Sequence, residues 1–153
     1  MRRTQLAAVL LSGALAVAGC TSTVAGEPKA GGAGGGDRAL VQVYFADLNT
    51  AGAQGPSAQR EFLAETQHPD YTELLCDLGD LTLSIEPAMT TFRTDPDWAP
   101  DPSDDPPRGD IYVLGVSVTI RQAGAVLAEQ IGSQRVVVLD GKAYGFAPCP
   151  TGR

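Results

Sequence analysis

The sequence contains few of the residues that catalytic sites most often use. It has one histidine, His68, one tryptophan, Trp98, and only 6% aromatic residues in 153. Any Ser-His-Asp relay would have to use His68, but this residue precedes Pro69, a position typical of a helix end. No G-x-S-x-G motif is present, and the nearest match, around Ser57, lacks the second glycine. We therefore predict no classical hydrolase centre.

Positive charge is also scarce. The chain has 11 lysines and arginines against 18 aspartates and glutamates, a net charge of −7. Arg2 and Arg3 lie in a segment that we expect to be removed. Their loss changes the net charge from −7 in the full chain to −9 in the mature chain. Such a charge disfavours nucleic acids and anionic lipid head groups as partners.

No apolar run is long enough to span a membrane, which takes about 20 residues. The longest, Leu6–Ala18, follows Arg2 and Arg3 at the N-terminus. A buried core helix has a similar length, but the arginine pair and the small residues at the end of the run favour an export signal. We predict a signal peptide over residues 1–19.

Val17, Ala18, Gly19 and Cys20 form a sequence that resembles a bacterial lipobox. The resemblance implies cleavage between Gly19 and Cys20, a diacylglyceryl group on the Cys20 thiol and acylation, for example with palmitate, of the new amine. Residues 21–26 are similar to the start of mycobacterial and other actinobacterial envelope lipoproteins. The protein would then be held by lipid on the outer face of the cell membrane. The alternative is an ordinary signal peptide with an incidental cysteine.

Residues 20–36 are predicted to form a flexible tether, because the glycine run over 31–36 cannot bury apolar area. A phosphate loop does not fit, since no Gly-Lys-Ser/Thr follows. The remainder, 37–153, is predicted to be one domain.

If Cys20 is lipidated, Cys76 and Cys149 remain, an even pair in an oxidising compartment. We predict a disulfide bond between them; the alternatives are two free thiols or a bond to a partner. Two thiols and one imidazole do not supply the four ligands of a usual zinc site. We predict no metal and no cofactor.

The domain has a helical half followed by a strand-like half. Apolar residues at helical spacing follow Asp37, a predicted N-cap, as far as Gly52, and a second helix is predicted from Pro56 to near His68. Alternating patterns predict strands over 81–86, 111–121, 126–139 and 143–147, with a break or bulge at Pro87, a bulge near Gly132 and a hairpin turn at Asp140-Gly141. This order predicts an α+β domain with the helices packed on a curved antiparallel meander of about four strands.

The order and length of the elements over 37–149 resemble the NTF2-like (cystatin-like) cone fold. That resemblance implies a concave sheet face, for which Tyr112, Leu114, Val116 and Tyr144 are the candidate ligand residues. Proteins with this fold include isomerases that use a carboxylate as the base and a phenol as the hydrogen-bond donor. The resemblance therefore makes Glu129 the candidate base and Tyr112 or Tyr144 the candidate donor. A mixed edge strand that exposes Glu129 explains the same pattern, and we favour this interpretation over a catalytic role.

Between two strands, residues 94–110 hold six aspartates, five prolines and Trp98. A calcium site is one interpretation of this segment, but the positions of its residues do not match the ligand spacing of an EF-hand. A solvated loop accounts for the composition. For Trp98 we favour a structural role over that of a partner anchor.

These observations favour a non-catalytic envelope module that binds a partner protein or a small apolar ligand. A small-molecule isomerase or hydrolase and a structural or antigenic surface lipoprotein are the alternatives.

Overall fold

The computed structural model describes residues 34–147. The predicted signal peptide, the Gly19–Cys20 cleavage site, most of the tether and Cys149 lie outside the described residues. The expectations that concern them stay predictions.

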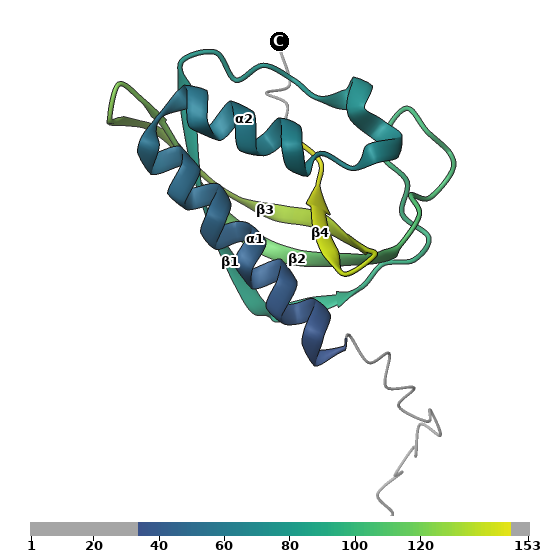
Figure 1. Ribbon diagram of the computed structural model, residues 1–153. Helices are drawn as coiled ribbons and strands as arrows, with labels where there is room; N and C mark the ends of the chain where they lie inside the picture. The colour runs from purple at the N-terminus through teal and green to yellow at the C-terminus, as the bar shows by residue number, and fades with distance from the viewer. Residues whose placement is uncertain (1–33, 148–153) are drawn as a thin grey trace, which may run out of the picture.

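Two helices and a short 3-10 helix precede a four-stranded sheet (Figure 1). The helices are α1 (Gly35–Gln54), α2 (Pro56–Thr66) and η1 (Pro69–Leu74). The strands are β1 (Leu81–Thr94), β2 (Asp110–Gln122), β3 (Ala125–Leu139) and β4 (Lys142–Gly145), antiparallel and in the order β1-β2-β3-β4. The helices pack on one face of the curved sheet, which confirms the predicted α+β architecture.

The core lies between α1 and the inner face of the sheet. Val41, Tyr44, Phe45 and Leu48 form one stripe of α1 and are all at most 5% exposed. Alternate strand residues meet this stripe: Leu83, Ile85, Tyr112, Leu114, Val116, Val136 and Val138. A helical period of 3.6 and a strand period of 2 therefore produce one shared apolar layer.

The ends of α1 differ from the prediction. The helix begins at Gly35, inside the predicted tether, and Asp37 is not its N-cap. The Asp37 carboxylate instead accepts a hydrogen bond from the Tyr112 hydroxyl at 2.6 Å. The helix also passes through Gly52 and ends at Gln54, followed by Gly55 as its C-cap, whose φ of 122° suits glycine. Gly52 serves close packing, because a Cβ there would lie 2.7 Å from the Leu83 carbonyl oxygen.

Two strand features also differ. Pro87 does not break β1, which continues to Thr94 with a register irregularity between Ala88 and Arg93. β1 is an edge strand, where a residue without an N–H is tolerated. The predicted bulge near Gly132 is wrong, since the irregularity of the β2–β3 pair lies between Ile120 and Arg121. The Asp140-Gly141 turn is confirmed, with both residues at positive φ.

Candidate functional site

The candidate ligand residues on the sheet do not form an open surface. Tyr112, Leu114 and Val116 are at most 4% exposed and belong to the core under α1. Tyr144 pairs with Val137 and so lies on the opposite sheet face. The expectation of a ligand surface at these four residues is therefore corrected: the protein's own first helix fills the concave face that three of them line.

The carboxylate and the phenols proposed for catalysis do not converge either. Glu129 is exposed and pairs with Thr119, which puts it on the outer face of the sheet, away from Tyr112. The Tyr112 hydroxyl already donates to Asp37, and burial together with this carboxylate raises the pKa of Tyr112. Glu129 and Tyr112 thus share no pocket in which a base and a donor could act together.

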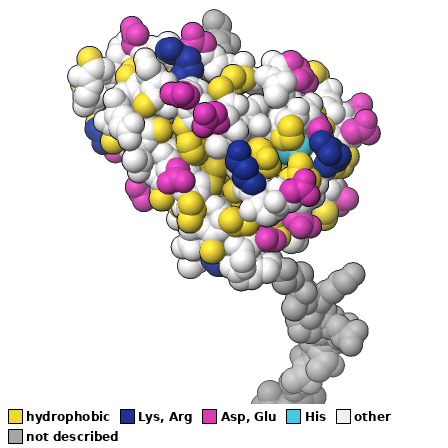
Figure 2. Space-filling view, in the orientation of Figure 1, with side chains coloured by type: hydrophobic (Ala, Val, Ile, Leu, Met, Phe, Trp, Pro, Cys, Tyr) yellow, Lys and Arg dark blue, Asp and Glu magenta, His cyan; other side chains and the backbone are white. Residues whose placement is uncertain are grey.

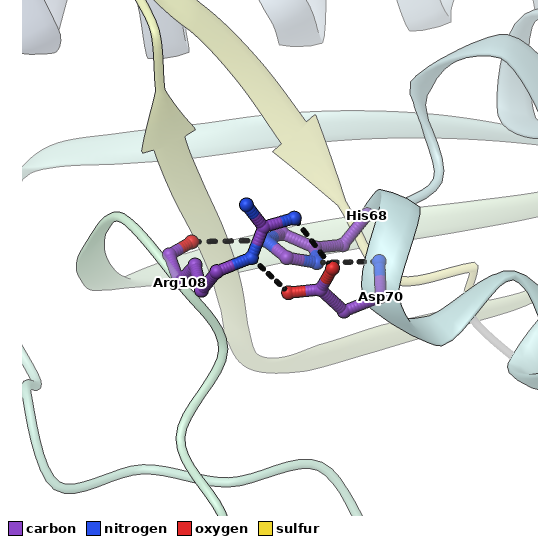
Figure 3. A network of polar contacts seen from close by, with 3 residues as sticks. All are labelled: His68, Asp70 and Arg108. Atoms are coloured by element: carbon purple, nitrogen blue, oxygen red, sulfur yellow. Dashed lines mark hydrogen bonds and ion pairs between the residues drawn. The ribbon is translucent and has the colours of Figure 1, made fainter.

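His68 has a structural position. It is completely buried, and its Nε2 donates to the Arg108 carbonyl oxygen at 2.9 Å while Nδ1 accepts from the Asp70 backbone N–H at 3.2 Å (Figure 3). Its ring stacks on Phe146 with 5.8 Å between ring centroids. Both nitrogens have partners, and the contacts join the helical half to the loop before β2. His68 is therefore not placed to act as a general base.

Asp70 and Arg108, whose backbone groups bond to the His68 ring, also form an ion pair with each other through their side chains. The Arg108 guanidinium donates two hydrogen bonds to the Asp70 carboxylate, at 2.8 and 2.6 Å. These bonds hold the pKa of Asp70 below its ordinary value, as does the positive charge of Arg108. Paired geometry of this kind fixes direction as well as distance.

We expect the Asp70→Asn variant to lose less of its free energy of unfolding than the wild type when the pH is lowered. A carboxyl whose pKa is lowered by folding stabilises the folded state above its unfolded pKa, about 3.9, and that stabilisation is lost as the pH falls through the folded pKa. The free energies of unfolding of wild type and Asp70→Asn should differ by a constant amount above about pH 5 and converge below about pH 4. Urea unfolding at pH 7, 5, 3 and 2 measures this. Asp104→Asn, at an exposed aspartate of the nearby loop, is the control; convergence for both variants alike would contradict the assignment.

The loop rich in aspartate and proline packs against the protein. Trp98 meets Phe146 edge to face at 4.8 Å, and the Arg135 guanidinium lies 5.3 Å from the Trp98 ring while pairing with Asp95 at 3.1 Å. The Tyr71 hydroxyl donates to the Asp105 carbonyl oxygen. Within residues 34–147 no three His, Cys, Asp or Glu side chains are grouped so that they could hold a metal ion. Trp98 is thus a packing residue of this loop.

Side chains close most of the sheet's free backbone edges. On β1, the Asn49 amide bonds to both the N–H and the C=O of Ile85, and the Gln59 amide does the same for Leu83, at 2.7–2.8 Å. Arg38 donates to the Met89 carbonyl oxygen. At β4, the His68 backbone N–H donates to the Gly145 carbonyl oxygen. These contacts leave β1 and β4 with few groups to offer another strand.

One stretch of edge is different. β4 pairs only with Val136–Leu139 of β3, so residues 127–135 of β3, which we call the open edge, have no strand on the side away from β2 in the described part of the chain. Leu127 and Ile131 there are 55% and 91% exposed, and the adjacent Val126 is 51% exposed. Exposed apolar side chains on an unpaired strand are typical of a binding site for another chain.

An open cleft adjoins this edge. It has a volume of about 720 Å³ and lies between the turn joining α1 to α2 and the turn joining β2 to β3. Its lining includes Gly52, Pro56, Thr82, Arg121 and Leu127, and Leu127 also belongs to the open edge. The exposed apolar surface therefore continues from β3 into the cleft.

The helix-covered face of the domain is mainly acidic. Figure 2 shows acidic side chains spread over the visible face, with few basic ones between them. Near the open edge, the exposed Glu129 forms no ion pair with a described residue, whereas Arg135 is neutralised by Asp95. An added chain would meet the negative charge of Glu129 here.

Sequence reasoning missed the open edge because it depends on how far β4 extends. The signal was present: the pattern of the third strand spans some fifteen residues, whereas only a few residues follow the Asp140-Gly141 turn before Pro148. A hairpin with such unequal arms leaves one arm partly unpaired.

Comparisons with protein-family models, with curated proteins and with solved structures find no match to this chain. None of the helices in residues 34–147 is long and apolar enough to cross a membrane.

Proposed function

We propose that the protein is a non-catalytic module of the cell envelope, anchored by lipid at Cys20, that binds a partner protein at the open edge of β3. The observation that carries this proposal is the exposure of Leu127 and Ile131 on a strand that is paired on one side only, in a domain whose other described sheet edges are mostly closed. No described arrangement of acid, base or nucleophile competes with this surface as a site.

The position of the open edge suits a partner beyond the membrane surface. The tether leads into the N-terminus of α1, and the 20 residues of α1 span roughly 30 Å. The turn joining β2 to β3 lies near the far end of α1 (Figure 1). A lipid anchor on Cys20 would therefore leave the open edge accessible from the periplasmic or extracellular side.

The position of Cys76 supports an exported protein with a disulfide bond. Its Sγ lies 4.0 Å from the carbonyl oxygen of Ala147. Cys149 follows only two residues later, beyond the described residues, so the chain passes within reach of Cys76 just before it. The predicted Cys76–Cys149 bond is part of this proposal.

Photo-crosslinking in living cells tests the binding function. A p-benzoylphenylalanine in place of Ile131 is expected to give one discrete heavier adduct after irradiation. The matched control carries the same group in place of Val43, an apolar residue of α1 that is 57% exposed and lies near the turn between β3 and β4 rather than at the open edge. Equal adduct patterns at the two positions, or none at Ile131, would contradict the proposal.

A further inference from the structure

Resting on the proposed function, we infer that the partner binds by strand addition: a positively charged, extended segment of the partner pairs with residues 127–135 of β3 and prolongs the sheet. The occupant is a segment of another protein rather than a second copy of this chain.

The backbone of the open edge points the right way for such pairing. Leu139 and Lys142 flank the two-residue turn and form a hydrogen-bonded pair, so the N–H and C=O of Leu139 point toward β4. The alternation of antiparallel pairs assigns the same direction to Arg135, Ser133, Ile131 and Glu129, because the β2–β3 register is continuous here. The open edge thus presents backbone donors and acceptors over roughly 30 Å.

On the β1 edge, side chains from the helices form hydrogen bonds with the backbone groups that face away from β2. Leu83 and Ile85 each have both backbone groups bonded to a side-chain amide from a helix, and Gln59 is fully buried to do so. Burying an amide is costly unless its hydrogen bonds are satisfied, as they are here. Gln134 and Arg135, at one end of the open edge, contact Phe146 and Trp98, but the backbone of residues 127–133 has no comparable cover in residues 34–147. The open edge also carries neither proline nor lysine, the residues that usually protect such strands.

The negative charge of the protein favours a positively charged segment of another protein at the open edge over a second copy of this chain. A mature chain near −9 repels a second copy, and pairing β3 with its own counterpart would add a second Glu129 to the same ribbon. Glu129 and Ile131 share the outer face of β3, whereas the other carboxylate in that row, Glu86, lies two strands farther from the open edge, on β1. A strand carrying lysine or arginine beside apolar residues would cover Ile131 and approach the Glu129 carboxylate.

Two fluorescent peptides serve as probes in the experiment. Both have about nine residues and alternate valine with a second residue, lysine in one and glutamate in the other. Each is titrated against the full chain purified from host membranes, with fluorescence anisotropy as the readout at low salt. We expect the lysine peptide to bind at least tenfold more tightly, and hydrogen–deuterium exchange to slow in residues 127–135. Equal affinities, or protection elsewhere, would overturn the inference.

Ser133→Pro and Ser133→Ala form the matched pair of variants. Both lose the hydroxyl, but only proline removes the outward N–H, while the bonds of β3 to β2 come from the alternate residues. We expect at least a tenfold loss of lysine-peptide affinity for Ser133→Pro and no change for Ser133→Ala; equal behaviour would overturn the inference. Should Ser133→Pro not fold, Glu129→Lys tests it instead, with an expected reversal of the preference between the peptides; an unchanged preference would overturn it.

The outcomes separate this inference from the proposed function. A crosslinked adduct at Ile131 without peptide binding at the open edge would leave the proposed function standing and overturn strand addition. Peptide binding without an adduct in cells would contradict the proposed function instead. Native mass spectrometry that detects a dimer, with residues 127–135 protected in it, would identify a second copy as the occupant and overturn the inference.

Discussion

Replacement of Cys20 by alanine is expected to release the protein from the cell membrane. Two or more acyl chains on one residue hold a protein stably, whereas a protein without them has no comparable attachment. The acidic domain does not replace the anchor, because its charge is repelled by anionic lipid. The mature protein should move almost entirely from the membrane fraction to the soluble exported fraction or the medium.

Fractionation of the host cell, followed by detection with an antibody, measures the effect. Cys76→Ala is the matched control, because it removes a cysteine from the domain and leaves the lipobox residues 17–20 intact. It should stay with the membrane. If Cys20→Ala stayed there as well, and was released only by detergent, the anchor would lie elsewhere and the lipoprotein assignment would be contradicted.

Loss of the Cys76–Cys149 bond is expected to destabilise the domain by about 4 kcal/mol, the chain-entropy value for a closed loop of roughly 70 residues. Cys76 is only half-buried and lies beside Ala147, so the substitution itself removes little packing. Most of the loss should come from the greater freedom of the unfolded chain.

Urea unfolding of Cys76→Ala, Cys149→Ala and the double variant tests this prediction. Because both cysteines belong to one bond, the double variant should be no less stable than either single variant. Reduction of the wild type should lower its stability to the same level and leave the variants unchanged. Additive losses in the double variant, or no effect of reductant on the wild type, would mean that these cysteines are not bonded to each other.

The α+β architecture could be predicted because its determinants are local. The apolar spacing from Leu40 to Leu48 and the alternation from Tyr112 to Ile120 each depend on neighbours within one element. The Asp140-Gly141 turn needs only two residues with positive φ. Patterns of this kind are visible before any tertiary contact is known.

The candidate site could not be predicted in the same way, because it depends on contacts between distant residues. That α1 covers Leu114, that Asn49 reaches Ile85 and that Gln59 reaches Leu83 are facts of tertiary packing. An alternating strand shows which residues share a face, but it does not show which face a helix will cover. The open edge is the exception, because the unequal lengths of sequence on the two sides of the Asp140-Gly141 turn already indicate that part of the third strand lacks a partner.

The most direct test of the central claim is native mass spectrometry of the protein extracted gently from its host's membranes, as wild type and as Ser133→Pro. We expect a lipidated chain that is lighter by two hydrogens because of the disulfide bond. In the wild type it should carry a non-covalently bound second protein that is absent from Ser133→Pro. A lipidated chain without any protein partner in either sample would contradict the binding function, and an unlipidated chain would contradict the anchor.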